Sequence, residues 1–402
     1  MQSSQHWFDL YDPRLKTDPY PIYKRLLEEE PFFTKVDGAR AAVFSRYHHV
    51  EAIYGDAALF SSVKPPNAVK SVDYFSGHLN IAFSDPPVHT RLRRTLNPAF
   101  MPASVARLTP AVERAVDDIL SAIEGRPRVE LMAEIARPLA QRVMLGELLQ
   151  VPAEDHDIFL DLASALFAPG GRMPGSPEAV HFDRCWSMAA TYCRRMIEAE
   201  KDTPTDGVLS NIVRRGGPDG VLTDDEVLAQ LITLLTGGFS TIASLIGTAF
   251  LQIASRPDQL ALLRGDPALA TNAVEEVARH RAPGLFNYRF PTREVEFAGL
   301  TLERNMPVYM LQGATSFDPD VFDDPFVFDI RRQPKRLLVF GHGIHHCIGA
   351  PVARLTTRTV LREAVNRFEA MELAEPLEAI RYTEAAQELS PVAVPLSLRK
   401  KG

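Results

Sequence analysis

The chain has 402 residues, enough to bury a large core and, by length alone, to form roughly two or three domains. Its composition is ordinary for a globular protein, with 46% hydrophobic and 24% charged residues, and a net charge of −7 argues against general nucleic-acid binding. Three cysteines without an even framework, and an N-terminus that lacks a charged region followed by an apolar one, predict a cytoplasmic protein without a signal peptide.

The first quarter of the chain predicts short helices and strands. Asp18 to Leu27 predicts a turn that enters a helix, Ala41 to Phe44 a short strand, and His48 to Tyr54 another helix. Residues 61–84 lack clean periodicity and contain prolines and a glycine, so they predict a long loop.

The next segment predicts helices with clear interruptions. D-P-P-V-H-T-R-L-R-R predicts a helix begun by proline, with His89 and Arg93 four residues apart on one face. Residues 105–150 carry helical patterns that break near Gly125–Pro127, and residues 156–200 predict two helices around a glycine- and proline-rich link.

A long uncharged stretch from Leu231 to Gln252 could by length span a bilayer. Hydroxyl side chains interrupt it, and no Lys, Arg, Trp or Tyr anchors flank its start. Thr223 to Glu226 matches a capping box directly before it. The pattern therefore favours a long helix through the core of a helical protein, with no membrane span.

The last third continues the same pattern. Residues 257–264 and 267–281 predict helices, and short strand-like runs follow between Gly284 and Leu311. The C-terminal L-R-K-K-G predicts a frayed tail. No linker or internal repeat divides the chain, so we expect a single domain over residues 1–402 that is mainly α with small β-sheets.

The segment F-G-H-G-I-H-H-C-I-G places Cys347 after a glycine-rich loop and directly before a predicted helix. Gly341, Gly343 and Gly349 allow positive φ angles or a close approach of the backbone to the sulfur. The unpaired N–H groups and positive dipole of a helix N-terminus are expected to lower the pKa of the thiol. A thiolate in this position suits a nucleophile or a metal ligand.

Four interpretations of this cysteine are open. It is a buried structural residue, a zinc ligand, a nucleophile paired with histidine, or a thiolate ligand of haem iron. His342, His345 and His346 lie near it, but no C-x-x-C partner exists, and Cys185 and Cys193 lie far upstream. Adjacent histidines also rarely align with a thiol for proton transfer.

The loop F-G-x-G-x-H-x-C-x-G strongly resembles the haem-binding loop of the cytochrome P450 family. The resemblance implies the cytochrome P450 fold, with a long central helix over a haem b (iron protoporphyrin IX). It also implies that Cys347 is the proximal iron ligand, and that Phe340, Gly341 and Gly349 form part of the cofactor-binding loop.

The resemblance extends over nearly the whole chain. Glu276 and Arg279 resemble the family's E-x-x-R motif, whose side chains share a helix face at this spacing. F-D-D-P-F-V-F-D-I-R-R resembles the meander whose arginine joins that pair; by spacing we assign Arg332, with Arg331 as the alternative. The resemblance gives these residues a structural role in bracing the haem loop.

Haem carries two propionates, which need cations and hydrogen-bond donors. His89 and Arg93 match the family's propionate contacts after D-P-P-x-H. Arg289 and His345 match two further contacts. A solvated surface charge would explain any one of them in isolation, but four in register with one cofactor favour haem binding.

The long helix departs from the family pattern at one position. Where relatives carry an acid before the threonine, this chain reads Gly237-Gly238-Phe239-Ser240-Thr241. The small residues leave room for O2, and Thr241 keeps the hydroxyl that would relay protons. A serine hydroxyl cannot deliver a proton from bulk water as an acid does, which puts the usual relay in doubt.

Three interpretations of Ser240 follow. The first is a working monooxygenase whose protons arrive through water and the two hydroxyls of Ser240 and Thr241. The second is a peroxygenase that uses H2O2, because peroxide brings its own protons. The third is a haem-thiolate enzyme with a non-oxygenating reaction, or a substrate whose own polar group completes the relay.

The resemblance implies a haem-thiolate monooxygenase that inserts one oxygen atom from O2 into a C–H bond, by hydroxylation or oxidative dealkylation. The substrate is expected to be small and hydrophobic, with aromatic compounds included. The pocket residues expected for it are Phe75, Thr233, Thr236, Leu285 and Phe286. For the phenylalanines, a plain core role is the competing interpretation.

Electrons must come from separate proteins, because the chain has no segment resembling a flavin or iron–sulfur reductase. By analogy with bacterial members, we expect an iron–sulfur ferredoxin with an NAD(P)H-dependent reductase. Its docking face is expected to be a basic patch of Arg91, Arg94, Arg354 and Arg358. A haem-thiolate binding protein without turnover, such as a gas sensor, is the competing class, although nothing in the sequence resembles an effector domain.

Overall fold

The computed structural model describes residues 7–65, 79–166, 175–205, 207–214, 222–333 and 335–401. Its α-helices are α1 (Arg14–Thr17), α2 (Tyr20–Glu29), α3 (Tyr47–Gly55), α4 (Val88–Phe100), α5 (Pro102–Ile123), α6 (Arg137–Gln141), α7 (His156–Leu166), α8 (Pro177–Asp202), α9 (Val208–Arg214), α10 (Asp224–Ala254), α11 (Pro257–Gly265), α12 (Ala270–His280), α13 (Gln312–Thr315) and α14 (Ala350–Arg367). Short 3₁₀ or π turns are η1 (Ile81–Phe83), η2 (Met132–Ala136), η3 (Arg142–Leu148), η4 (Ala153–Asp155), η5 (Pro267–Leu269), η6 (Leu338–Phe340), η7 (Gly343–His345) and η8 (Leu377–Ala379).

The strands form two small sheets and a hairpin. They are β1 (Phe32–Val36), β2 (Ala39–Phe44), β3 (Phe60–Ser61), β4 (Arg128–Glu130), β5 (Asn287–Pro291), β6 (Val295–Phe297), β7 (Leu300–Leu302), β8 (Val308–Met310), β9 (Phe368–Leu373) and β10 (Pro395–Lys400). The larger sheet has the order β1-β2-β8-β5-β3, and only its β2–β8 pair is parallel. The second has the order β4-β10-β9, and β6 pairs with β7.

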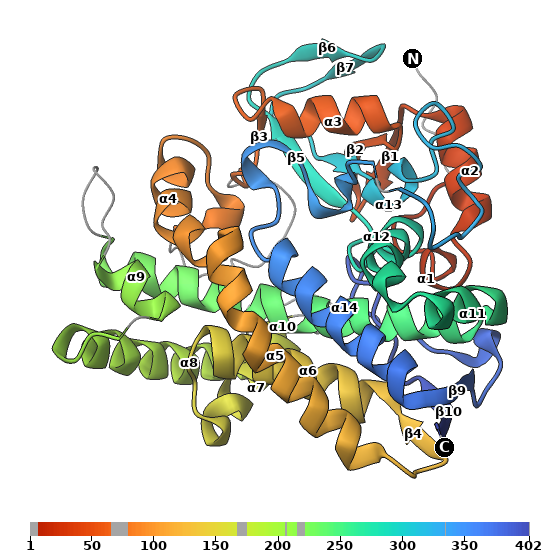
Figure 1. Ribbon diagram of the computed structural model, residues 1–402. Helices are drawn as coiled ribbons and strands as arrows, with labels where there is room; N and C mark the ends of the chain where they lie inside the picture. The colour runs from red at the N-terminus through yellow and green to blue at the C-terminus, as the bar shows by residue number, and fades with distance from the viewer. Residues whose placement is uncertain are drawn as a thin grey trace.

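Helix α10 runs through the middle of the molecule (Figure 1). It packs against α14, α12, α6, α7 and α8, which surround it along its length. The larger sheet gathers with α2 and α3 on one side of α10, whereas α5, α7 and α8 lie on the other side (Figure 1). This arrangement places α4, α10 and the loop before α14 around the same central region.

The sequence of α10 explains why it forms a long buried helix. The Thr223 hydroxyl accepts from the Glu226 N–H, and the Glu226 carboxylate accepts from the Thr223 N–H, so the expected capping box is present. Most of the following residues are buried and apolar. Among the described residues, α10 is the one helix long and apolar enough to span a bilayer, and 78% of its most apolar window is buried inside the protein.

Two apolar clusters make up the core. The larger extends from α4 and α5 through α10 and α12 to α14. The smaller joins the N-terminal segment and α2 to strand β8 and residues near 285 and 317. This mainly helical architecture with small sheets confirms the expected fold class.

The C-terminal segment differs from its sequence-based expectation. Of the residues expected to fray, 398–400 belong to β10, a strand that lies between β4 and β9 and pairs with both. Leu396 and Leu398 are buried there. The prediction was wrong because strand partners far along the chain, which local sequence cannot show, supply the hydrogen bonds.

Candidate functional site

The loop before α14 is closed by backbone hydrogen bonds. The Cys347 N–H donates to the Phe340 carbonyl at 2.8 Å, and the Gly341 N–H donates to the Leu338 carbonyl at 2.8 Å. Gly341 has a φ of +74°, and a Cβ there would lie 3.2 Å from the His345 carbonyl oxygen. Both its backbone angle and its neighbours therefore favour glycine at this position.

Gly343 ties the loop to helix α3. Its φ is +66°, and a Cβ there would lie 2.6 Å from the carbonyl oxygen of Tyr54. Gly349 is different, since a Cβ there would have no neighbouring atom within 4 Å. Phe340 lies beside α14, where the guanidinium carbon of Arg354 is 4.2 Å from the centre of its ring.

Cys347 stands next to the N-terminus of α14. Burial raises the pKa of its thiol, while the N–H groups of Gly349 and Ala350 and the charge of Arg93 act in the opposite direction. The residue is exposed in the protein alone. The N–H groups at the start of α14 act on the thiol in the expected direction, although burial acts more strongly on its pKa.

Four basic side chains from three parts of the chain converge near the thiol. His89 and Arg93 extend from α4, Arg289 from β5 and His345 from the cysteine loop. The ring centres of His89 and His345 are 4.3 Å apart. The charges of Arg93 and Arg289 both act on His345, and the charge of Arg93 also acts on Cys347.

Burial dominates the electrostatics of this cluster. It lowers the pKa of His89 to about 4 and that of His345 to about 3, and neighbouring arginine charges add to both effects. It also lowers the pKa values of Arg93 and Arg289. Asp85 is the acidic group that acts on His89 and Arg289. Its carboxylate also accepts hydrogen bonds from Ser61 and Ser62.

The donor set fits the group that the family resemblance implies. Both ring nitrogens of His89 are buried without a hydrogen-bond partner among the described residues. Buried basic groups of this kind are costly unless an anion or acceptor meets them. The two carboxylates of a haem would satisfy this requirement, and the Cys347 thiol offers a soft iron ligand beside them.

The zinc alternative finds no support in the geometry. Among the described ranges, no group of three or more His, Cys, Asp or Glu side chains is arranged to hold a metal ion. The histidines next to Cys347 therefore do not complete a protein-only metal site with it. Cys185 and Cys193 are buried on α8.

One face of α10 is exposed near the candidate site. Gly237 and Thr241, one turn apart, are exposed in the middle of a helix that is otherwise largely buried, and Thr233 on the same face is half-buried. The Thr241 hydroxyl donates to the Gly237 carbonyl at 2.9 Å. The Thr233 hydroxyl likewise donates to the Ala229 carbonyl at 2.7 Å.

The two neighbouring glycines of α10 have different surroundings. A Cβ on Gly237 would have no neighbour within 4 Å, which leaves the exposed face open. A Cβ on Gly238 would lie 2.2 Å from the Cε of Met144 in η3. Gly238 therefore belongs to a helix contact, although the sequence placed both glycines in the catalytic set.

The expected pocket residues are divided by the structure. Thr236 is buried, and its hydroxyl donates to the Ile232 carbonyl at 2.7 Å. Leu285 and Phe286 belong to the smaller core cluster, where the Phe286 ring meets the Tyr309 ring edge-on at 5.7 Å. Neighbouring elements cover all three, and their assignment to the substrate pocket stays a prediction. Phe75 lies outside the described residues.

The E-x-x-R pair is buried and fully engaged. Arg279 Nε donates to Glu276 Oε2 at 2.7 Å, and both side chains are at most 2% exposed. Arg279 also donates to the carbonyls of Ser316 at 2.9 Å and Pro325 at 2.7 Å. Of the two candidate arginines, Arg332 lies against the pair, with its Nε 3.4 Å from Glu276 Oε2.

The alternative meander arginine, and Arg91 and Arg354 of the expected basic patch, form ion pairs with acids. Arg331 forms an exposed ion pair with Asp329 at 2.9 Å. Arg91 pairs with Glu226 of α10, and Arg354 pairs with Glu275 of α12. The patch of four arginines was thus wrong for Arg91 and Arg354, because nearby acids offset their charges. Arg94 and Arg358 are exposed.

One residue near the site was missed in the sequence. Glu388, in the segment before β10, accepts a hydrogen bond from the Ser244 hydroxyl of α10 at 2.7 Å. The two residues are 144 positions apart, and the sequence around Glu388 matches no motif. Only the packing of the chain brings this carboxyl group to α10.

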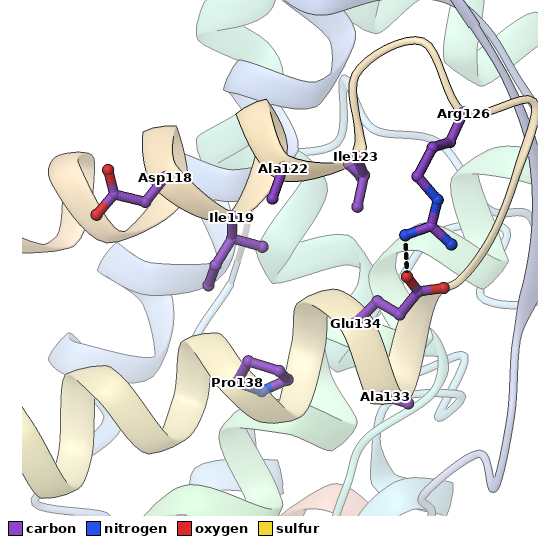
Figure 2. Close-up of a pocket in the computed structure, with 8 residues that line it drawn as sticks. All are labelled: Asp118, Ile119, Ala122, Ile123, Arg126, Ala133, Glu134 and Pro138. Atoms are coloured by element: carbon purple, nitrogen blue, oxygen red, sulfur yellow. Dashed lines mark hydrogen bonds and ion pairs between the residues drawn. The ribbon is translucent and has the colours of Figure 1, made fainter. Parts of the chain in front are cut away.

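A hollow on the surface lies between α5 and the η2–α6 segment (Figure 2). Arg126 and Glu134 form an ion pair at one end of it. Its lining consists of Asp118, Ile119, Ala122, Ile123, Arg126, Ala133, Glu134 and Pro138. None of the sequence-predicted site residues is among them, so this hollow is separate from the candidate site.

Comparison with known proteins gives a consistent result. The family model for cytochrome P450 matches residues 267–381. Cytochrome P450 monooxygenase PikC of Streptomyces venezuelae is 32% identical, over 91% of this chain and 88% of that protein. The 6-deoxyerythronolide B hydroxylase of Saccharopolyspora erythraea is 31% identical, over 91% and 92%. The myxobacterial cytochrome P450 CYP267B1 in complex with myristic acid superposes with a TM-score of 0.89 at 28% identity, covering 97% of this chain and 98% of that one.

Proposed function

Because this chain belongs to the cytochrome P450 family and is a cytochrome P450 monooxygenase, we propose that it oxidises a small hydrophobic substrate with O2. The proposed reaction inserts one oxygen atom into a C–H bond, by hydroxylation or oxidative dealkylation. Family membership implies a haem-thiolate cofactor, and we propose haem b. The convergence of Cys347 with His89, Arg93, Arg289 and His345 is the observation that supports the proposal most strongly.

In this proposal the protein holds the haem from two sides. Cys347 would ligate the iron, and Gly341 and Gly343, with their positive φ angles, would hold the loop that presents the sulfur. His89, Arg93, Arg289 and His345 bind the propionates, which supply the acceptors that the buried His89 nitrogens lack. When bound, the haem supplies the oxidising chemistry, and electron donation from a thiolate favours O–O cleavage, as is general in this family.

The long helix governs what reaches the haem. Gly237 keeps its exposed face free of side-chain atoms, which leaves space for O2 beside Thr241. The hydroxyls of Thr241 and Ser240 move protons, and Thr241 is anchored for this by its bond to the Gly237 carbonyl. Thr233, one turn before Gly237, is the described residue that we assign to the substrate pocket, together with Phe75. An apolar substrate is supported by the myristic acid held by CYP267B1.

We assign the electron supply to an iron–sulfur ferredoxin with its NAD(P)H-dependent reductase, acting in the cytoplasm. The exposed Arg94 and Arg358 are the described members of the basic patch that could attract an acidic donor. Added salt should therefore lower the association rate with the donor. Charge reversal of Arg358 should also lower this rate without changing the spectrum of the protein.

Replacement of Cys347 by alanine tests the cofactor assignment. The protein expressed with a haem supply should form a thiolate-type carbonyl complex when reduced, and Cys347→Ala should lose it. Cys185→Ala serves as the matched control and should keep the complex. A colourless wild-type protein, or an unchanged carbonyl Soret band in Cys347→Ala, would contradict the proposal.

A second candidate function is oxidation driven by H2O2, which the absence of an acid at Ser240 favours. The discriminating experiment compares rates with NADH plus donor proteins and with H2O2, using a compound that shifts the iron from low to high spin. Faster peroxide-driven turnover in the wild type than in Ser240→Asp favours the peroxygenase. A rise of NADH-driven turnover in Ser240→Asp favours the monooxygenase with a limited proton supply.

A further inference from the structure

Glu388 lies within hydrogen-bond distance of a hydroxyl group of α10, that of Ser244. The Ser244 hydroxyl lies 2.7 Å from Glu388 Oε1 and 2.8 Å from the Ser240 carbonyl oxygen, and its single proton is donated to one of these two oxygens at a time. Positions 240 and 244 follow Gly237 and Thr241 by three residues each, so all four share one broad face of the helix. Glu388 is therefore next to the exposed face on which O2 would be handled.

Backbone hydrogen bonds hold the residues on both sides of Glu388. The Leu285 N–H donates to the Gln387 carbonyl at 2.9 Å, and the Leu389 N–H donates to the Pro283 carbonyl at 2.7 Å. A β-bridge between Gly284 and Glu388 lies between these two bonds. The segment after α12 thus holds the Glu388 side chain in a defined position against α10.

Ser240 supplies the second observation. Its Oγ is buried and has no hydrogen-bond partner within ordinary geometry among the described residues. Its hydroxyl is nevertheless close enough to Glu388 to help lower the pKa of that carboxyl group. A small movement of either side chain, or one water, would join them, and this would satisfy a buried hydroxyl that is otherwise costly.

Burial favours the protonated form of Glu388, whereas the charge and the hydrogen-bond donors around it favour the ionised form. Burial raises the pKa of Glu388, whereas the bond from Ser244, the charge of Lys16 and the Ser240 hydroxyl oppose that rise. Lys16 is the cation that faces the group, and it donates to the Ala385 carbonyl at 2.6 Å. Ser240 and Ser244, the α10 side chains next to Glu388, are uncharged.

We propose that Glu388 replaces the acid missing from α10 and supplies protons to Ser240 and Thr241. The inference rests on the proposed monooxygenase function and deepens it. Each turnover consumes one O2, two electrons from the donor and two protons; one oxygen atom enters the product and the other leaves as water. The Glu388 carboxyl releases a proton to Ser240, whose hydroxyl passes its own proton toward Thr241. Bulk water on the Lys16 side then reprotonates Glu388.

Replacement of Glu388 by glutamine tests the relay in the haem-containing enzyme. Glutamine has the size of glutamate and still offers Ser244 a hydrogen-bond acceptor, but its amide does not release a proton as a carboxylic acid does. NADH-driven product formation should fall about tenfold or more, with more NADH used per product. Turnover with H2O2 should change by no more than about twofold, because peroxide brings its own protons. Glu384→Gln, an exposed acid on the same segment, should leave both rates unchanged.

A second measurement needs no turnover. Infrared spectra of the resting protein over a pH series should show a carboxyl band that titrates above the range of an ordinary glutamate, which Glu388→Gln removes and Glu384→Gln keeps. Ser244→Ala should move the titration of this band to higher pH, because the lost hydrogen bond favours the ionised form. This readout reports on Glu388 whether or not the substrate is known.

Two outcomes would overturn the inference. One is wild-type NADH-driven rate and coupling in Glu388→Gln. The other is a pH series in which no carboxyl band assignable to Glu388 titrates above the range of an ordinary glutamate. Failure of the proposed function looks different, since the wild type would then form no NADH-driven product with any compound, and Glu388→Gln would not differ from it.

Discussion

Gly237 and Gly238 are adjacent on α10 but have different surroundings. A side chain at Gly237 would enter open space, whereas one at Gly238 would meet Met144. In an exposed helix interior, either glycine costs about 0.5–1 kcal/mol relative to alanine. Because the space at Gly237 is open, we attribute the glycine there to function. Because Gly238 contacts Met144, we attribute the glycine there to helix packing.

Alanine substitutions at the two glycines should therefore have different effects. Gly237→Ala is expected to raise the free energy of unfolding by about 0.5–1 kcal/mol and to lower turnover, because the added methyl group occupies the O2 side of α10. Gly238→Ala is expected to raise the free energy of unfolding by less, because its methyl group must displace the flexible end of Met144, which offsets part of the gain in helix propensity.

Urea unfolding of both variants, with turnover measured in parallel, checks this expectation. Gly247→Ala is the matched control for packing, because a Cβ there would lie 2.3 Å from the Sδ of Met132. It should behave like Gly238→Ala in stability. Equal stabilities of the Gly237 and Gly238 variants would contradict the assignment of different roles.

His280 is a buried histidine whose role is structural. Its Nε2 lies 3.3 Å from the Phe326 carbonyl, and its Nδ1 lies 2.9 Å from the Tyr20 hydroxyl. A carbonyl only accepts, so Nε2 carries the proton and Nδ1 accepts from Tyr20. Burial lowers the pKa of His280 to about 3, with the charges of Arg279, Arg256 and Arg281 adding to the effect.

The protein should lose stability in acid through His280. In the unfolded chain its pKa is about 6.5, so between about pH 6.5 and about pH 3 the unfolded state binds a proton that the folded state does not. The contribution of His280 to the free energy of unfolding is therefore fully present above pH 6.5. Below that pH it falls by about 1.4 kcal/mol per pH unit.

Urea unfolding of the wild type and His280→Gln across this pH range measures the effect. Glutamine stays neutral, so the variant should lose less stability than the wild type as the pH falls. His48→Gln, an exposed histidine on α3, is the control and should follow the wild type. Parallel pH curves for the wild type and His280→Gln would contradict this interpretation.

At the scale of elements, Glu276 and Arg279 connect α12 to the segment that leads to the cysteine loop. The Arg279 guanidinium binds three carbonyls of that segment, those of Ser316, Pro325 and Val327. Glu276 in turn accepts from the Asp329 N–H at 3.0 Å. The pair therefore holds about a dozen residues without regular structure against the helix core.

Disruption of the Glu276–Arg279 pair should release the segment between Ser316 and Asp329 from α12. Arg279→Ala leaves a buried carboxylate and three carbonyls without their donor, and should cost about 3–5 kcal/mol of stability. Haem content after expression should fall in parallel, because the loop that carries Cys347 loses its support. Arg331→Ala, which removes only an exposed pair with Asp329, should change stability by less than about 0.5 kcal/mol.

Denaturant unfolding and the ratio of haem to protein report on both variants. Full haem content and wild-type stability in Arg279→Ala would show that the segment is held by other contacts. The exposed Arg331 pair also illustrates why spacing alone left two candidate arginines. Adjacent side chains at a turn face different directions, and only the fold decides which one reaches Glu276.

At the scale of the whole molecule, the two ends of the chain are tied to distant parts. Strand β10 lies between β4 and β9. Lys16, near the N-terminus, donates to the Thr383 and Ala385 carbonyls close to Glu388. Long-range contacts of this kind cost loop-closure entropy and become favourable only when the core forms.

Deletion of residues 395–402 should therefore destabilise the protein strongly. It removes β10 and the buried Leu396 and Leu398, at a cost of at least about 4 kcal/mol when about 2 kcal/mol is counted for each leucine. Deletion of residues 401–402 alone removes the hydrogen bond from the Lys401 N–H to the Arg367 carbonyl and should cost no more than about 1 kcal/mol. Unfolding curves in urea compare the two; equal midpoints would show that the C-terminal segment is dispensable.

The sequence alone predicted those features that depend on local chemistry. The glycine spacing before Cys347, the capping box at Thr223 and the apolar character of α10 each act within a few residues, so their patterns are visible in the chain. They were enough to identify the family and the helical fold class. The absence of an acid at Ser240 was equally visible.

Tertiary structure decided which side chains meet. It separated Gly237 from Gly238, placed Leu285 and Phe286 in the core, paired Arg91 and Arg354 with acids, and turned the C-terminal segment into a strand. It also brought Glu388 to Ser244 across 144 positions. Such contacts follow from the packing of the whole chain, because burial and distance between remote residues leave no periodic trace in a single sequence.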